Sequence, residues 1–114
     1  MHIDSYRFGE IVVDGVSYNN DIIIFGGFVH PNWWRKHSHL LSAEDIQLII
    51  ASKPSTLIVG CGTSGLMQVQ EETRQLLQER NIQLEASDTS EAVRRFNELS
   101  KAGIDVAAAL HITC

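Results

Sequence analysis

The sequence predicts a single α/β domain with three layers, built on a mostly parallel sheet in the C-terminal half of the chain. Two observations support this prediction. Strand-like and helix-like segments alternate over the last stretch of about fifty residues, the pattern of a parallel sheet covered by helices. Short β-prone runs separated by turn residues precede them, over residues 6–29. A chain of 114 residues is close to the commonest domain size, so we expect one domain over 1–114.

The N-terminal part has the pattern of antiparallel hairpins. Its short β-prone runs cover residues 6–8, 11–13 and 16–18. Asp14-Gly15 supplies the positive-φ pair that a tight hairpin turn requires. A continuous apolar strand is expected at 22–25, ended by Gly26-Gly27. From the residues alone, these hairpins either form an additional β layer or extend one edge of the sheet.

Residues 28–41 show no period, so we expect them to form a long surface loop. A helix should begin after Ser42, whose side chain can cap the first backbone amides. The apolar residues Ile46, Ile49 and Ile50 have the spacing of a buried helix face. Lys53-Pro54 ends this helix, because proline disfavours helical conformation in the residue before it.

The remainder alternates between strands and helices. We expect a strand at 56–59, a glycine-rich turn at 60–65, a helix at 70–80, a strand at 82–86, a helix at 88–102 and a strand at 105–111. Asp88 and Glu91 stand in capping-box positions at the start of the last helix. Right-handed crossovers should place these two helices against one face of the sheet, with the helix after Ser42 on the opposite face.

Composition excludes several classes of protein. The net charge of −5 repels phosphate backbones, so we expect no nucleic-acid partner. The two cysteines, Cys61 and Cys114, form no disulfide framework or metal motif, and free thiols suit a reducing compartment. Because the N-terminus lacks the order of a signal peptide and no apolar run approaches the length of a membrane span, we expect a cytoplasmic protein.

The turn Gly60-Cys61-Gly62-Thr63-Ser64-Gly65 follows a predicted strand and matches the pattern G-x-G-x-x-G. In that pattern exposed amides and a helix N-terminus face a pyrophosphate. Here the next helix starts several residues beyond Gly65, and the chain holds only half of a dinucleotide fold. Nucleotide binding is therefore one alternative. The others are a plain tight turn, and a small anion or polar group held by the turn at Gly60, Cys61, Gly62 and Thr63.

Cys61 lies inside this turn, where free amides can lower the pKa of a thiol and make it a nucleophile. The histidines that could act as its base are His30, His37, His39 and His111, and no local motif selects one of them. A cysteine-dependent enzyme or redox protein is therefore a second alternative, against a small buried residue. The loop with His37-x-His39 lacks the ligands that would complete a zinc site, so we expect no metal.

The tetrapeptide Trp33-Trp34-Arg35-Lys36 is the most unusual in the chain. Trp and Arg are enriched at interface hot spots, so Trp33, Trp34 and Arg35 are candidates for the wall of a site or for core packing. Asn97 stands inside the predicted helix 88–102, where asparagine is unfavourable by propensity. It either lines the same site or makes a structural hydrogen bond.

Several motifs together resemble one family in order and spacing. They are the stretches 9–18, 57–63, 72–77, 88–99 and 106–111, with the pair Trp34-Arg35. The family is the domain-of-unknown-function family that includes the adipogenesis-associated Mth-type domain protein and the mitochondrial complex I assembly factor 3. The resemblance implies a three-layer α/β domain with a central mixed sheet and an added N-terminal β layer. It implies no established reaction, and in one branch an assembly role, which is a binding role.

We therefore expect a non-catalytic binding module that recognises a protein partner or a small polar or anionic ligand at the glycine-turn edge of the sheet. The candidate ligand-binding residues are Gly60, Cys61, Gly62, Thr63, Asn97, Trp33, Trp34 and Arg35. We expect no cofactor. Cys61 is the one candidate catalytic residue, for the cysteine-dependent alternative.

Overall fold

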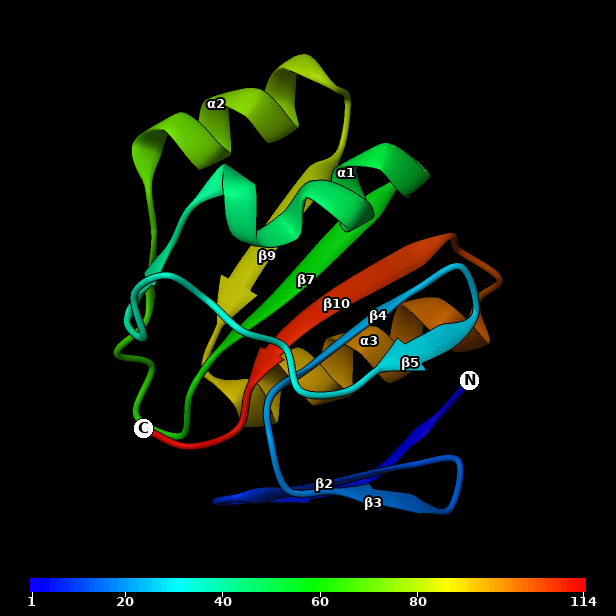
Figure 1. Cartoon of the computed structure of the whole chain (residues 1–114). Coiled ribbons are helices and arrows are strands. Elements are labelled where there is room, and N and C mark those ends of the chain that lie inside the picture. The colour runs from blue at the N-terminus through cyan, green and yellow to red at the C-terminus, as the bar shows by residue number, and fades with distance from the viewer.

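A mixed five-stranded sheet forms the middle layer of the computed structural model, which describes residues 1–114 (Figure 1). Its strands, in spatial order, are β5 (Phe28–His30), β4 (Ile22–Phe25), β10 (Val106–His111), β7 (Thr56–Cys61) and β9 (Gln83–Ser87). The strands β10, β7 and β9 are parallel, whereas β4 and β5 continue the sheet in antiparallel pairing. The predicted fold class, an α/β domain on a mixed and mostly parallel sheet, is confirmed.

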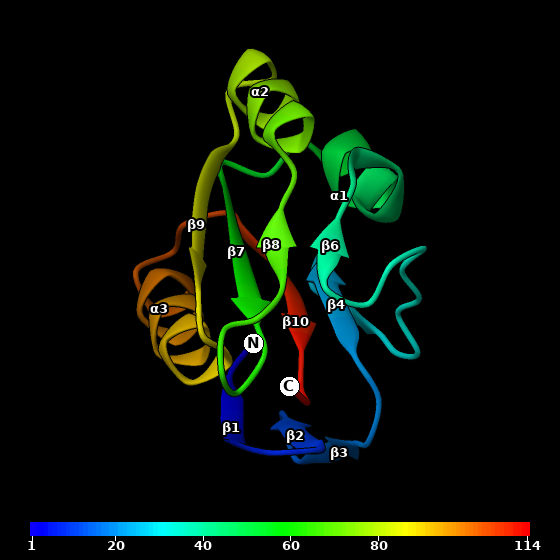
Figure 2. The ribbon, with the colours of Figure 1, turned by 90° about the vertical axis from the view of Figure 1, so that its left-hand side faces the viewer.

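Helices cover both faces of this sheet. A 3₁₀ turn (Ala43–Ile46), α1 (Gln47–Ser52) and α2 (Glu71–Glu79) pack on one face. The longer helix α3 (Thr89–Lys101) packs on the other, as Figure 2 shows. None of these helices combines the length and the apolar character needed to cross a membrane.

The prediction that the last two helices share one face is wrong, and the strand order gives the reason. The chain moves outward from β7 to β9 and then returns past β7 to β10. Both crossovers are right-handed by the general rule, so a reversal of direction moves the second helix to the opposite face. The structure therefore pairs α2 with α1 and leaves α3 on the other side. The reversal also creates a topological switch point between the carboxyl ends of β7 and β10.

A second, antiparallel sheet shares the layer of α3. It consists of β1 (Ile3–Arg7), β2 (Glu10–Val13) and β3 (Val16–Tyr18) (Figure 1). Its buried residues Ile3, Ile11 and Val13 join one apolar cluster with Phe96 of α3. Asn97 fixes this sheet to the helix, because its amide donates to the Ile3 carbonyl at 2.9 Å and accepts from the Ile3 amide at 2.8 Å. The N-terminal hairpins thus form a separate sheet beside α3 and do not extend the edge of the five-stranded sheet.

Residues 28–41 were expected to be a loop, and part of that expectation is wrong. Gly26 and Gly27, with φ values of 61° and 80°, make a tight turn that returns the chain as the edge strand β5. Further on, β6 (Leu40–Leu41) pairs in parallel with β8 (Gln68–Val69). The Gly-Gly pair between two apolar runs is a hairpin signal in the sequence. Strands of two residues are too short to show an alternation of apolar and polar residues.

Candidate functional site

The carboxyl ends of the parallel strands meet at one edge of the sheet, where open α/β sheets commonly bind ligands. The strands β7, β9 and β10 end there at Cys61, Ser87 and His111. The strand β7 extends two residues beyond its predicted end at 59, so Gly60 and Cys61 belong to the sheet rather than to the turn. The turn itself begins at Gly62, beside the N-terminus of α3.

The amides of this turn are bonded within the protein. The Gly62 N–H donates to Thr89 Oγ1 at 2.9 Å, and the Thr63 N–H donates to the Thr113 carbonyl at 2.8 Å. The Gly65 N–H donates back to the Gly62 carbonyl at 3.1 Å. A ligand-binding turn would need these donors to be open to a ligand. The structure shows that they hold the chain's own turn, helix start and C-terminal segment.

The close approach that the glycines permit is also internal. A Cβ built on Gly62 would lie 2.6 Å from the carbonyl oxygen of Cys114, at a backbone φ of 100°. A Cβ on Gly60 would lie 2.9 Å from Thr89 Oγ1. The crevice at the switch point is therefore filled by residues 112–114 and by the first residue of α3. No amide cradle for a pyrophosphate is left at Gly62 or Thr63.

A single hydroxyl joins three elements at this point. Thr89 Oγ1 donates to the His111 carbonyl at 2.6 Å and accepts from the Gly62 N–H. The Thr89 N–H donates to the Gly62 carbonyl at 3.1 Å. Because Thr89 is fully buried, these bonds are shielded from competing water. They fix the end of β10, the glycine turn and the start of α3 relative to one another.

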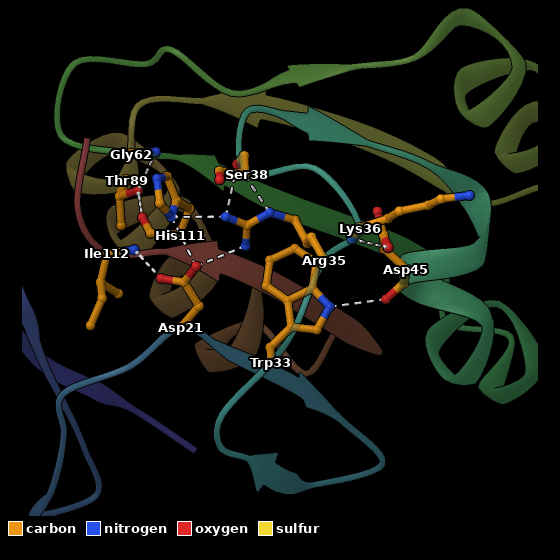
Figure 3. Close-up of polar contacts among 10 residues, drawn as sticks. All are labelled: Asp21, Trp33, Arg35, Lys36, Ser38, Asp45, Gly62, Thr89, His111 and Ile112. Atoms are coloured by element: carbon orange, nitrogen blue, oxygen red, sulfur yellow. Dashed lines mark hydrogen bonds and ion pairs between the residues drawn. The ribbon is translucent and has the colours of Figure 1, made fainter.

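Beside the filled crevice lies a buried cluster of three charged or titratable side chains: Asp21, Arg35 and His111 (Figure 3). Asp21 Oδ2 accepts from Arg35 Nη1 at 2.8 Å and lies 2.9 Å from His111 Nδ1. The other oxygen, Oδ1, accepts from the Ile112 N–H at 2.8 Å. A carboxylate with donors on both oxygens is held firmly, so Asp21 joins the chain after β3 to the end of β10.

These contacts set the charge of Asp21. Burial raises the pKa of its carboxyl, but hydrogen bonds from His111, the Ile112 amide and Arg35 outweigh that effect and hold the pKa below its ordinary value. The carboxylate is therefore charged throughout the neutral range, and the cluster combines a negative Asp21 with a positive Arg35.

Arg35 is a structural residue rather than an open cation. Its side chain is 4% exposed. Besides the bond to Asp21, its Nε and Nη2 donate to the Ser38 carbonyl at 3.2 and 2.9 Å. Its guanidinium also lies 4.6 Å from the centre of the Trp33 ring. With these partners, Arg35 fixes the loop that carries the two tryptophans, and its charge is already paired with Asp21.

The adjacent tryptophans have different surroundings. The Trp33 indole packs against the core on the α1 face and donates to the Asp45 carbonyl at 2.9 Å (Figure 3). Trp34 is 76% exposed. It stands on the wall of a cavity of about 490 Å³, whose lining includes His39, His111 and Cys114. A second hollow of about 380 Å³ lies on another side of Trp34, lined in part by Asn19, Asn32 and Thr113.

Cys61 lies on a different cavity, of about 430 Å³, with Arg74, Ser87 and Asp88. Burial raises the pKa of its thiol above the ordinary value, although the charge of Arg74 and the Ser87 amide partly oppose this. The low thiol pKa that the cysteine-dependent alternative needs is therefore not what this environment favours. Cys61 contributes to the buried cluster on the α1 face.

The structure brings some predicted site residues together and separates others. Trp33, Trp34 and Arg35 share the 490 Å³ cavity, whereas Cys61 lines the cavity of about 430 Å³. Asn97 is held against β1 and borders a third cavity with residues of α3 and the N-terminus. It is not part of the glycine-turn edge, so its predicted role as a wall of that site has no support in the geometry.

The histidines considered as metal ligands do not gather at one site. His30 stacks on Phe25 with ring centres 4.2 Å apart, whereas His39 packs edge-on against His111 at 5.9 Å. No three His, Cys, Asp or Glu side chains gather closely enough to hold a metal ion.

Asp21 was not among the site residues expected from the sequence, and His111 was named only as one of four possible bases for Cys61. Asp21 ends the triplet Asn19-Asn20-Asp21, which has the composition of a turn and no feature that distinguishes it from other turns. His111 did carry a signal. It ends the expected strand 105–111, whose Val, Ala and Leu residues are typical of a buried strand, and a buried imidazole needs hydrogen-bond partners.

These features define a small three-layer α/β domain whose switch point is occupied by its own backbone. A family model described as a protein of unknown function (DUF498/DUF598) matches residues 3–111. The chain therefore belongs to the DUF498/DUF598 family, and the resemblance seen in the sequence motifs is confirmed.

Solved structures agree with this assignment. The protein MT938 is 28% identical, with a TM-score of 0.82 over 99% of this chain and 98% of its own. The conserved hypothetical protein PH1505 from Pyrococcus horikoshii is 24% identical, with a TM-score of 0.81 over 100% of both chains. A Mth938-like domain from Bordetella pertussis is 23% identical, with a TM-score of 0.79 over 97% of this chain and 85% of its own. The last two likenesses show the shared fold.

The packing of Gly62 predicts a strong effect of a single methyl group. Gly62→Ala forces a Cβ against the Cys114 carbonyl at a positive φ and should lower the free energy of unfolding by about 3–5 kcal/mol. Gly27→Ala is the matched control, because it also has a positive φ but nothing within 4 Å of its Cβ, and should cost about 1–2 kcal/mol. Urea unfolding measures both. Equal losses in the two variants would contradict the internal role of Gly62.

The lowered pKa of Asp21 predicts a loss of stability in acid. A carboxyl whose pKa is lower in the folded state stabilises the fold fully at pH values above its unfolded pKa of about 4. This contribution is lost as the pH falls through the folded pKa. The free energy of unfolding should therefore fall as the pH is lowered below about 4, and this fall should be smaller in Asp21→Asn. Urea unfolding across that pH range tests this, and identical pH profiles would refute it.

The burial of Cys61 predicts that its thiol reacts slowly at neutral pH and has a raised pKa. In a Cys114→Ser background, alkylation of Cys61 should show an apparent pKa above the ordinary cysteine value of about 8.5. The single-variant Cys61→Ser, which keeps Cys114, supplies the exposed thiol as a reference. Rapid alkylation of Cys61 at neutral pH, with an apparent pKa below the ordinary value, would restore the cysteine-dependent alternative.

Proposed function

We propose that this domain is a non-catalytic binding module that recognises a small polar ligand in the 490 Å³ cavity beside Trp34. The observation that carries the proposal is the exposed Trp34 indole on the wall of a cavity whose lining also includes the fixed Asp21–Arg35–His111 cluster. A large aromatic side chain left in water beside a hollow is typical of a recognition site, because it supplies contact area at a small entropic cost.

The position of the cavity supports the same proposal. It lies beside the carboxyl end of β10, close to the topological switch point, and the crevice at that point is closed by residues 112–114. A ligand at this edge of the sheet would therefore bind next to the crevice rather than inside it. The wall is well prepared for this, because Arg35 and Trp33 already hold the loop in one conformation.

The charges around the cavity favour a neutral polar ligand over an anion. Arg35 is the only lysine or arginine in the cavity lining, and it is already bonded to Asp21 and to the Ser38 carbonyl. Asp21 itself is negative and lines the same cavity. An anion would thus meet a carboxylate and no open cation among these residues, which costs free energy in a partly buried site.

A matched pair of aromatic variants tests the proposal. A panel of neutral ring compounds with polar substituents is titrated into ¹⁵N-labelled protein, and the indole N–H signals of Trp33 and Trp34 are followed. We expect binders to shift the Trp34 signal, and Trp34→Ala to weaken their binding by about tenfold or more. Phe28→Ala should leave it within about twofold, because Phe28 is 70% exposed but lies outside the cavity lining.

Binding that depends on Phe28 as much as on Trp34 would contradict this assignment. So would a panel in which no compound perturbs Trp34. If only a protein partner perturbs Trp34, the cavity wall is a protein interface and the small-ligand proposal is wrong.

A further inference from the structure

The imidazole of His111 is left with one unused nitrogen. The residue is 5% exposed, and its Nδ1 lies within hydrogen-bond distance of Asp21 Oδ2. Its Nε2, on the other edge of the ring, is buried and has no hydrogen-bond partner in the protein (Figure 3). Buried polar atoms are nearly always partnered, so an orphan on a residue that lines a cavity marks a place for a group from outside.

The contacts of Nδ1 decide which form of the imidazole is present. The Asp21 carboxylate can only accept a hydrogen bond, so the 2.9 Å contact requires a proton on Nδ1. The Arg35 Nη2, 3.1 Å from the same nitrogen, then donates to the Ser38 carbonyl at 2.9 Å instead. With the proton on Nδ1, the neutral ring has a lone pair on Nε2. A second proton there would be a buried donor without an acceptor, close to the positive Arg35.

We infer that the cavity beside Trp34 takes a small neutral ligand with a planar face and a hydroxyl or amino group, and that this group donates a hydrogen bond to His111 Nε2. The inference rests on the proposed function and names the chemistry of its ligand. The planar face lies against the exposed Trp34 indole, and the donor pairs with His111 Nε2, the one buried nitrogen without a partner among the residues that line the cavity. Acceptor-only ligands are disfavoured, because they would meet the lone pair.

The exposed side chain of His39 packs against the His111 ring. The His39 imidazole packs against His111 with ring centres 5.9 Å apart and an angle of 65° between the planes. His39 is exposed and makes no side-chain hydrogen bond, so its displacement breaks little more than this ring–ring contact. In the proposed complex the ligand displaces His39 and pairs with Nε2, which is otherwise shielded from water.

A pair of probes separates donor recognition from simple burial. Phenol and fluorobenzene have nearly the same shape, but only phenol donates a hydrogen bond. Each is titrated into wild-type protein labelled with ¹⁵N at histidine, and the His111 ring nitrogens and the Trp34 indole are followed by NMR. We expect phenol to shift the Nε2 resonance. Phenol should also bind at least about fivefold more tightly than fluorobenzene, because the net contribution of one hydrogen bond to affinity is of that size. Fluorobenzene is the more hydrophobic probe, so burial alone predicts the opposite order.

The outcomes distinguish the two proposals. If fluorobenzene shifts Trp34 as strongly as phenol and Nε2 does not respond to phenol, the donor inference is wrong while the binding site stands. If neither probe, nor any member of the neutral panel, shifts Trp34, the proposed function is wrong as well. A ¹⁵N spectrum of the free protein that places the proton on Nε2 would also overturn the inference.

Two neighbouring histidines supply the matched variants. His39→Ala removes the covering ring, and His37→Ala removes an exposed histidine of the same loop that makes no ring contact with His111. We expect His39→Ala to raise the affinity for phenol by about twofold to fivefold and His37→Ala to leave it unchanged. Loss of phenol binding in His39→Ala alone would show that phenol binds His39 instead of His111, which would refute the inference.

Discussion

The carboxylate of Asp21 is the constraint on which the candidate site depends. It accepts from Arg35 and from the Ile112 amide, and it holds the His111 ring through Nδ1. These partners come from the Trp-bearing loop and from the end of β10, segments far apart in the sequence. Removing the carboxylate would leave a buried guanidinium and a buried imidazole without their common acceptor, and a buried charge without its partner is strongly destabilising. The cavity therefore has its shape because one acid holds two separate segments in place.

A second constraint closes the neighbouring crevice. The glycine-rich turn resembles a phosphate-binding loop in sequence, and it occupies the position after a parallel strand where such loops stand. Its amides and its lack of side chains are used to pack residues 112–114 and the start of α3. The same chemistry that would bind a phosphate group binds the protein's own carbonyls and a threonine hydroxyl. The glycine motif thus indicates that another group packs closely against this backbone, but it does not indicate whether that group belongs to a ligand or to the protein itself.

The sequence predicted local structure well where a period was long enough to read. The strands and helices of the C-terminal half lie within a few residues of their expected bounds, and Asp88 caps α3 as its position indicated. The face of α2 could not be predicted from its own residues, because it depends on the spatial order of the strands. The cluster of Asp21, Arg35 and His111 was equally hidden, since its members are brought together only by the finished sheet. Trp33 and Trp34 were singled out by residue type, and their division into one packed and one exposed ring required coordinates.

That division has a consequence for optical spectroscopy. The two indoles are adjacent in sequence, yet one is tied to a main-chain oxygen beside a guanidinium and the other stands in solvent. Their fluorescence emission should therefore differ in colour and in susceptibility to external quenchers. The chain carries no other tryptophan, so its intrinsic emission combines one component sensitive to unfolding with one sensitive to the state of the cavity mouth.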